Sequence, residues 1–457
     1  MGRWIEHWQP EDEGFWQRQG RAVARRNLAF SMVTEFLGFS VWMVWSVTAA
    51  KLDQAGFDFS TGQLFTLVSV PALVGATARF PYTFAVARFG GRNWTVVSAL
   101  LLLVPTAVLP LLVSNPATPY WAFLLGAATA GLGGGNFASS MANISFFYPD
   151  RHKGLALGLN AAGGNLGVAG VQLLVPVAVT TGSLAVVGGA QGGGSLFLQN
   201  AGLIWVPFIV AAALCAGRFM DNLRVSQAPL RQQAVVVKRK HTWVMSWLYI
   251  GTFGSFIGYS AGLPLLIATQ FPDVKVGIAF LGPLVGSLSR PLGGWLADRV
   301  GGARVTLATF AAMVPAVLGV AFFLNRGSDP DAFVGFLAGF VALFVLTGIG
   351  NGSTYRMVPM IFRAHHAATA QGRGRQGDET ALRETASALG FISAVGAYGG
   401  WLIPQAYGLS TSLTGEPRAA LYGFLGFYLS CIALTWWHYL RTSFALRRAP
   451  SLAWAKV

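Results

Sequence analysis

Charged residues are scarce in this sequence. Asp, Glu, Lys and Arg make up 11% of the 457 residues and 54% are hydrophobic, whereas a soluble domain carries roughly 25% charged residues. The two cysteines, Cys215 and Cys431, cannot build a disulfide framework, and the six histidines lack the spacing of metal ligands. We therefore expect a membrane protein without a bound metal ion or cofactor.

Long apolar runs take the place of the missing charge. A helix of about 20 residues crosses a bilayer, and twelve segments reach that length. The predicted spans are 28–50, 62–87, 94–114, 120–147, 154–178, 202–219, 243–269, 276–297, 304–324, 332–361, 385–408 and 419–440. The polar, partly acidic N-terminus is unlike a cleavable signal peptide, so the first helix is expected to be retained. The sequence predicts an all-α membrane protein with twelve transmembrane helices.

Acidic residues are outnumbered by basic ones, 17 against 32, which gives a formal net charge of +15. Outside the predicted spans, one side of the topology holds only Lys51, Lys275, Arg326 and Arg418, and all other basic residues lie on the side of the two termini. By the positive-inside rule, both termini are predicted to be cytoplasmic. Because orientation accounts for the basic charge, no nucleic-acid partner is expected.

The sequence also contains an internal repeat. GATARFPYTFAVARFGGR in the first six helices matches GSLSRPLGGWLADRVGGAR in the last six: a glycine stands four residues before an arginine within the membrane, and an arginine and a glycine pair follow at equal distances. ALGLNAAGGNLGV resembles ALGFISAVGAYGGW, and TAGLGGGNFASSM more weakly resembles LTGIGNGSTYRM. Repeated halves with a central site are typical of secondary transporters.

This repeat predicts the domain organisation. Two pseudo-symmetric six-helix halves are separated by the basic stretch DNLRVSQAPLRQQAVVVKRKH. The expected boundaries are a cytoplasmic N-terminal segment at 1–27, a first half at 28–220, a cytoplasmic linker at 221–242, a second half at 243–441 and a cytoplasmic tail at 442–457.

The matched arginines of the repeat are Arg79 and Arg290. An arginine at the centre of a membrane helix costs about 2.5–3.5 kcal/mol on insertion scales and usually faces an internal cavity. Each lies about 16 Å of helix from its cytoplasmic loop, too far for comfortable snorkelling. We therefore expect the two guanidinium groups to face each other and to share an anion, for which their planar donor fork suits a small planar oxyanion. The alternative is pairing with an internal carboxylate.

Glu35 is the only acidic residue that falls inside a predicted span. It cannot neutralise Arg79, Arg290 and also Arg356, so we expect an electropositive cavity. The residue types leave two roles for Glu35 open, a structural carboxylate or a proton carrier. Other acidic groups are placed in loops: Asp298 with Arg299 in the GGWLADRVGG loop, where a gating ion pair is expected, and the RGRQGDETALRE run in a solvated loop.

At this point the motifs are similar to those of a known family. WQPEDEGFWQRQGRAVARRNL, GGGNFASSMANISFFYP, TFGSFIGYSAGLP and QFPDV, together with the glycine-dense pair, resemble the nitrate/nitrite porter (NarK-like) branch of the major facilitator superfamily over essentially the whole chain. The resemblance implies the major facilitator fold, a monomer in the bacterial inner membrane, and rocking of the halves around the anion. Expected partners are nitrate, nitrite, protons and membrane lipid.

The resemblance also implies the site residues. Arg79 and Arg290 would grip the anion with help from Tyr249, and Phe137 and Phe253 would enclose it. The family's two nitrate signatures would contribute three further residues, Asn160, Asn165 and Ser393. Spacing alone would not select these aromatic, amide and hydroxyl groups.

Glu35 and Arg356 depart from the exchanger-like members of the family and resemble its nitrate/proton symporter branch. Symport is therefore the leading hypothesis, and electroneutral nitrate/nitrite antiport, which needs no acidic group, is the alternative. A passive channel is disfavoured because paired arginines form a binding site. An enzyme is disfavoured because no nucleophile–base set or cofactor loop is found, and GLGGGNF reads as helix packing rather than a phosphate loop.

Overall fold

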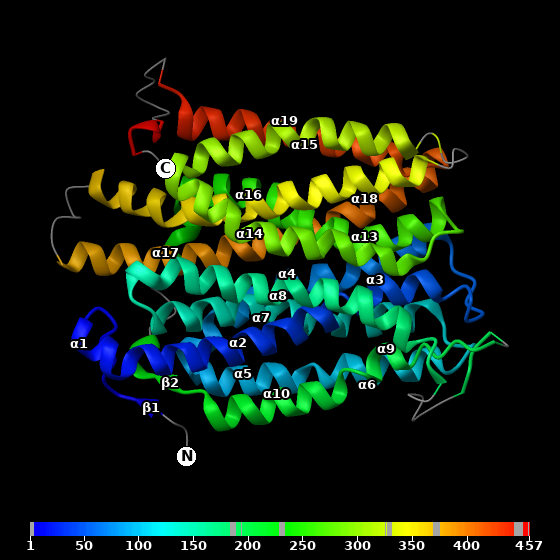
Figure 1. Cartoon of the computed structure of the whole chain (residues 1–457), viewed down its shortest axis with the longest axis horizontal. Coiled ribbons are helices and arrows are strands. Elements are labelled where there is room, and N and C mark those ends of the chain that lie inside the picture. The colour runs from blue at the N-terminus through cyan, green and yellow to red at the C-terminus, as the bar shows by residue number, and fades with distance from the viewer. Residues whose placement is uncertain are drawn as a thin grey trace.

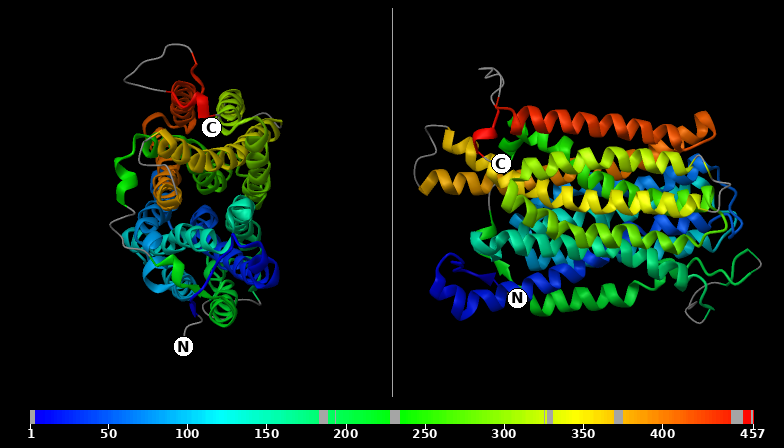
Figure 2. Two further views of the ribbon diagram at one scale, coloured as in Figure 1. Left: turned by 90° about the vertical axis from the view of Figure 1, so that its left-hand side faces the viewer. Right: turned by 45° about the horizontal axis from the view of Figure 1, so that its top comes forward.

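The computed structural model describes residues 4–182, 189–192, 194–227, 234–324, 326, 331–368, 375–442, 451–455 and 457. Long helices run roughly side by side, and both chain termini lie at one end of the bundle (Figure 1). We call this end the terminal face and the other end the opposite face. Seen along the helices, the first and second parts of the chain form two adjacent bundles (Figure 2).

The first bundle contains six helical units. They are α2 (Arg21–Trp42) with α3 (Val44–Thr48), α4 (Thr61–Phe89), α5 (Gly91–Leu101) with α6 (Leu103–Val113), α7 (Tyr120–Phe147), α8 (Asp150–Ala178), and α9 (Asn200–Leu203) with α10 (Val206–Phe219).

The second bundle also contains six helical units. Its units are α12 (Lys240–Tyr249) with α13 (Ser255–Gln270), α14 (Leu281–Val300), α15 (Gly302–Leu324), α16 (Ala332–Ala368), α17 (Arg375–Ala397) with α18 (Gly399–Thr414), and α19 (Arg418–Thr435). A π-helical segment, Ile250–Gly254, joins α12 to α13.

Among the described residues, 11 helical units are long and apolar enough to cross a membrane. The remaining predicted span is α7, a 28-residue helix that glycine, serine and asparagine make less apolar. Large apolar side chains such as Leu111 (71% exposed) and Leu413 (75% exposed) cover the outside. A soluble protein rarely exposes such a surface, so the prediction of an all-α membrane protein in two six-helix halves is confirmed.

The repeat found in the sequence appears as two equivalent helix ends. Gly90 ends α4 at φ 86°, and Gly301 ends α14 at φ 94°. This left-handed conformation is readily available only to glycine. Each glycine lies eleven residues after the intramembrane arginine of its helix, Arg79 or Arg290, so the repeat sets the depth of both arginines.

The N-terminal segment is folded against the bundle. Strand β1 (Trp4–Ile5) pairs in parallel with β2 (Asn222–Leu223), which lies in the stretch expected to be a linker. The short helix α1 (Glu13–Phe15) follows, and Trp8 donates from its indole nitrogen to the carbonyl of Phe146 at 3.0 Å. The N-terminal segment therefore packs on the last turn of α7.

The RGRQGDETALRE run is not the solvated loop that we expected. Its first two residues, 373 and 374, lie outside the described residues, but from Arg375 onward the chain is the first part of α17. Glu384 is buried there and forms an ion pair with Arg239, whose Nη2 lies 2.8 Å from Oε1. Arg, Gln, Glu, Ala and Leu all favour helix, so the transmembrane helix extends beyond its apolar part.

Side-chain hydrogen bonds and an ion pair connect the two halves on both sides of the bundle's midpoint. Toward the opposite face, Gln172 of α8 donates to the carbonyl of Ser260 at 2.6 Å, and Gln405 of α18 donates to the hydroxyl of Ser69 at 2.9 Å. At the terminal face, Asp150 and Arg363 form an ion pair of 3.6 Å.

Glycines allow helices to approach within each half. Gly167 of α8 packs on α2, and its carbonyl accepts a hydrogen bond from the Ser40 hydroxyl at 3.0 Å. A Cβ added at Gly167 would lie 3.1 Å from the backbone nitrogen of Ser40 and closer still to the carbonyl of Phe36. No side chain fits there without moving α8 away from α2.

We predict that Gly167→Ala lowers the stability of the protein by about 1–3 kcal/mol, because overpacking forces the backbones apart. The measurement is the apparent melting temperature of the purified protein in detergent. Gly158→Ala, on the same helix, is the matched control, because an added Cβ there meets nothing within 4 Å. Since alanine favours helix over glycine, Gly158→Ala should leave the melting temperature unchanged or raise it. An equal response of the two variants would contradict the packing argument.

Candidate functional site

Arg79 of α4 and Arg290 of α14 lie in the interior between the two halves. Their side chains belong to residues that are 0% and 3% exposed. The described residues contain no salt bridge to either one.

Arg79 is held by one carbonyl group from each half. Its Nε donates to the carbonyl of Gly134 in α7 at 3.0 Å, and its Nη1 donates to the carbonyl of Ser393 in α17 at 2.9 Å. Its Nη2 is buried and has no hydrogen-bond partner among the described residues. The guanidinium is thus fixed in place, and its Nη2 is still available as a donor.

Arg290 has a similar arrangement with fewer partners. Its Nη2 donates to the hydroxyl of Tyr249 at 3.4 Å, and its buried Nη1 has no hydrogen-bond partner in the part of the chain described. Each arginine therefore keeps a free donor. Because guanidinium groups have donors and no acceptor, a ligand that satisfies both must supply acceptor atoms.

Aromatic rings pack between and around the guanidinium groups of Arg79 and Arg290. The ring of Phe137 has its centroid 4.7 Å from Cζ of Arg79 and 5.7 Å from Cζ of Arg290, so it contacts both. Phe253 lies 4.8 Å from Arg79 and stacks on Phe137 at 5.7 Å. A cation over an aromatic face gains up to about 2 kcal/mol when desolvated. These rings partly compensate the burial of the charges and exclude water from around them.

The π-helical segment sets the position of the rings from the second half. Tyr249 is the last residue of α12 and Phe253 lies within Ile250–Gly254. Their rings stack with centroids 5.4 Å apart. Single π-helical turns occur frequently at functional sites, and this one places a hydroxyl beside Arg290 and an aromatic face beside Arg79.

The residues of the two glycine-dense helices contribute unequally. The Ser393 hydroxyl donates to the carbonyl of Gly390 at 2.8 Å, so Ser393 reaches Arg79 through its backbone only. Asn160 donates to the hydroxyl of Ser140 at 3.0 Å. Asn165 is buried, and neither of its amide atoms has a hydrogen-bond partner among the described residues.

Glu35 is fully buried on α2. It packs against Gly164 of α8, where an added Cβ would lie 3.4 Å from its Oε1. Neither carboxylate oxygen makes a hydrogen bond of standard geometry within the described residues, although the Ser140 hydroxyl is close enough to interact. Arg79 and Arg290 are also within electrostatic range. The carboxylate is thus near the arginines without being tied to them.

Asp298, Arg299 and Arg356 lie elsewhere than we expected. Asp298 and Arg299 belong to the last turn of α14 rather than to a loop. Asp298 forms its ion pair with Arg356 of α16, and these two side chains are 55% and 43% exposed. Arg299 instead lies over the ring of Trp295, with its Cζ 3.9 Å from the centroid. Arg356 therefore does not add to the charge at the centre.

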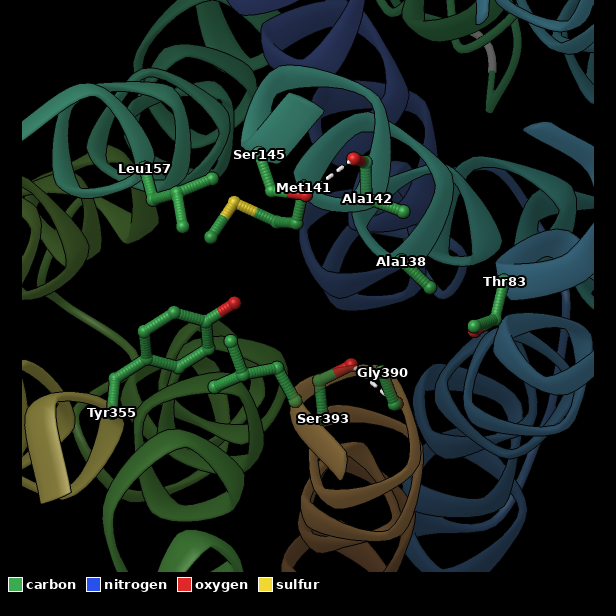
Figure 3. A pocket seen from close by; sticks show the side chains of 10 residues that line it. Thr83, Ala138, Met141, Ala142, Ser145, Leu157, Tyr355, Gly390 and Ser393 are labelled. Carbon is green, nitrogen blue, oxygen red and sulfur yellow. Dashed lines mark hydrogen bonds between the residues drawn. The ribbon is translucent and has the colours of Figure 1, made fainter. Parts of the chain in front are cut away.

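A cavity lies between the halves on the terminal-face side of the arginines. The residues that line it come from α4, α7 and α8 of the first half and from α16 and α17 of the second. Met141, Leu157 and Tyr355 are among them, and the Tyr355 ring points into the space (Figure 3). The lining is mostly apolar and, among the described residues, contains no charged side chain.

Three residues at or near the centre were not selected by sequence reasoning. The Trp42 ring lies 5.3 Å from Cζ of Arg79, and the Tyr355 ring lies 5.5 Å from Cζ of Arg290. Asn351 is 0% exposed and, among the described residues, has no partner for either amide atom. The weak repeat LTGIGNGSTYRM contains Tyr355 and Asn351 and could have indicated both.

Comparison with known proteins adds to this geometry. The family model described as Major Facilitator Superfamily matches residues 28–377. The chain is 46% identical over 446 residues to the nitrate/nitrite transporter NarU of Salmonella typhimurium, with 96% of both chains covered. It is 37% identical to the probable nitrate/nitrite antiporter NarK2 of Thermus thermophilus, covering 96% of this chain and 97% of that protein.

Solved structures share the fold at low sequence identity. An inward-facing, unoccupied bacterial homolog of the human lysosomal transporter Spinster aligns with a TM-score of 0.64 and 15% identity, covering 92% of this chain and 96% of that one. FucP in its outward conformation aligns with a TM-score of 0.54 and 17% identity, covering 89% and 98%. Because the family model matches most of the chain and the relatives align almost from end to end, this protein belongs to the Major Facilitator Superfamily, in the group that includes NarU and NarK.

Proposed function

We propose that this protein transports nitrate, and also nitrite, across the bacterial inner membrane by alternating access. The observation that carries the proposal is the pair of buried guanidinium groups, one from each half, that contact a single ring, Phe137. Each has a nitrogen without a hydrogen-bond partner among the described residues. A small planar oxyanion placed between them would supply the acceptors that both donors need. The names of NarU and NarK2 support nitrate and nitrite as that anion.

The contacts of Arg79 suggest how binding is linked to movement. Its hydrogen bond to Ser393 crosses from the first half to the second, whereas its bond to Gly134 stays within the first half. Rocking of the halves would break the bond to Ser393. An anion bound by both Arg79 and Arg290 would then attract the two halves to each other. The loaded protein could therefore pass through conformations that repulsion between the two arginines disfavours in the empty protein.

The proposed orientation places the terminal face in the cytoplasm. The positive-inside distribution of basic residues supports this assignment. In that orientation the cavity lined by Met141, Leu157 and Tyr355 lies between the anion site and the cytoplasm. The bonds of Gln172 and Gln405 to the other half would close the external side.

Coupling to protons is the mode that the charges favour. An anion that enters against an inside-negative potential is opposed by about 2.3 kcal/mol per 100 mV, and a co-transported proton cancels this charge. Glu35 supports the assignment, because it is buried beside the site, without a salt bridge in the described part of the chain. Antiport is the second candidate, and it is favoured by the name of the NarK2 relative at 37% identity.

We predict that Arg79→Lys and Arg290→Lys each weaken nitrate binding by about tenfold to a hundredfold, because an ammonium cannot reproduce the planar fork and a hydrogen bond to a charged group contributes about 1.5–3 kcal/mol. Binding is measured by calorimetry with the purified protein. Arg88→Lys, an exposed arginine on the same helix as Arg79, is the matched control and should bind as the wild type does. Normal binding by Arg79→Lys would rule out the shared anion site.

We predict that Glu35→Gln abolishes accumulation of nitrate driven by a pH gradient and preserves exchange of nitrate for nitrite. The reason is that the amide keeps the size of the side chain but cannot release a proton. The measurement is uptake into liposomes with the pH gradient, the voltage and the internal nitrite varied independently.

Glu416→Gln, at an exposed carboxylate paired with Arg418, serves as the control for this experiment. It should transport as the wild type does under all conditions. Wild-type uptake that requires internal nitrite and ignores the pH gradient would reject symport in favour of antiport, and Glu35 would then have a structural role.

A further inference from the structure

Asn351 of α16 is a buried amide whose position calls for an explanation. It is 0% exposed, and neither Nδ2 nor Oδ1 has a hydrogen-bond partner among the described residues. Buried polar side chains in folded proteins are nearly always hydrogen-bonded. An amide that the described residues leave unsatisfied is suited to bind a ligand.

The packing of its neighbours shows which way Asn351 points. A Cβ added at Gly350 would lie 2.7 Å from Cγ2 of Thr252 in the π-helical segment. A Cβ added at Gly352 would instead contact α14, at the carbonyl of Arg290. With 3.6 residues per turn, the residue between Gly350 and Gly352 points between the face of α16 that contacts the π-helical segment and the face that contacts α14. The Asn351 side chain therefore faces the gap between the π-helical segment and α14.

That gap contains the second-half part of the anion site. The hydroxyl of Tyr249, the residue before the π-helical segment, accepts a hydrogen bond from Arg290 of α14. Tyr355, one turn after Asn351 on the same side of α16, has its ring 5.5 Å from Cζ of Arg290 and 6.1 Å from the Tyr249 ring. Residues four apart share a helix face, so Asn351 is directed toward the same pair.

The internal repeat leads independently to the same position. A Cβ added at Gly131 would lie 2.8 Å from the nitrogen of Gly75, and one added at Gly348 would contact the carbonyl of Gly286. Gly75 and Gly286 are the glycines four residues before the two arginines. Gly131 and Gly348 are therefore equivalent positions in the two halves.

Three residues further along, Asn351 is equivalent to Gly134. The carbonyl of Gly134 accepts the hydrogen bond from Nε of Arg79, so the equivalent position in the second half lies beside Arg290. In the first half an aromatic ring occupies the space for a side chain, because a Cβ at Gly134 would lie 2.7 Å from Nε1 of Trp42. The two halves therefore differ here: the Arg79 side has an indole and the Arg290 side has an amide.

We infer that Asn351 is a further substrate-contacting residue, and that it selects nitrate over nitrite. The inference rests on the proposed function. Nitrate has three oxygen atoms in one plane and nitrite has two. If the free donors of Arg79 and Arg290 bind two oxygens, the Asn351 amide nitrogen can donate to the third. Nitrite has no third oxygen, so its binding leaves this donor unsatisfied, and unsatisfied polar groups are a strong basis for discrimination.

The test is calorimetric titration of the purified full-length protein with sodium nitrate and, separately, with sodium nitrite. Asn351→Ala should raise the Kd for nitrate by about tenfold, as loss of one hydrogen bond to a charged group predicts, and the Kd for nitrite by less than about twofold. Asn351→Ser retains a shorter donor, so its nitrate-to-nitrite Kd ratio should fall between those of the wild type and Asn351→Ala. If Asn351→Ala does not fold, the ratio in Asn351→Ser decides.

The matched control is Asn136→Ala on α7, the helix equivalent to α16. Asn136 is buried, but its Oδ1 accepts from the Ser98 hydroxyl at 2.9 Å, so it has a structural partner. This change should leave the ratio of the two Kd values unaltered. Equal weakening of both anions in Asn351→Ala, or no weakening, would overturn the inference and leave the proposed function intact. A wild-type protein that binds neither anion would overturn the proposed function itself.

Discussion

Two buried positive charges that face one ring impose the main constraint on this structure. Arg79 and Arg290 come from different halves and both contact Phe137, and neither forms a salt bridge in the described part of the chain. Burial of unpaired charge is expensive, and the protein compensates with carbonyl groups, aromatic faces and the Tyr249 hydroxyl. These groups fix the orientation of the guanidinium groups without neutralising them. The proposed transport depends on the attraction of these two guanidinium groups for a small anion.

The rest of the fold brings carbonyl groups and aromatic rings close to Arg79 and Arg290, where they compensate the buried charge. Glycines such as Gly134 and Gly350 let helices approach until backbone carbonyls and rings reach the centre. The π-helical segment Ile250–Gly254 aligns Tyr249 with Phe253. Because the site lies between two rigid bundles rather than within one, movement of one half against the other changes the contacts of both arginines. In the proposed transport, this movement would expose a bound anion to one side of the membrane at a time.

The two halves are similar in backbone but not in chemistry. Gly90 and Gly301 end equivalent helices with nearly the same φ, and Arg79 and Arg290 lie at equivalent depths. Around them the side chains differ: the first half supplies Trp42 and the buried Glu35, and the second supplies Tyr355 and Asn351. This asymmetry gives the first half a buried carboxylate and the second half a buried amide. In the proposed transport, Glu35 would therefore serve coupling and Asn351 would serve selectivity.

The sequence by itself determined the helical membrane architecture, the duplication and the equivalent positions of Arg79 and Arg290 in the two halves. The length of an apolar run and the spacing of rare charges can be recognised in the sequence without knowing which residues are in contact. The sequence could not determine which charges meet. The sequence places Arg356 with the central arginines, but in the folded protein it pairs with Asp298 near the surface. It places Glu384 in a solvated loop, but Glu384 is a buried helical residue that pairs with Arg239. Asn351 lies in the weak repeat LTGIGNGSTYRM, but the repeat alone does not distinguish a ligand-binding amide from an asparagine that packs among glycines. Only the tertiary structure decided these roles, because the direction of a side chain and its partners depend on how separate helices are rotated against each other.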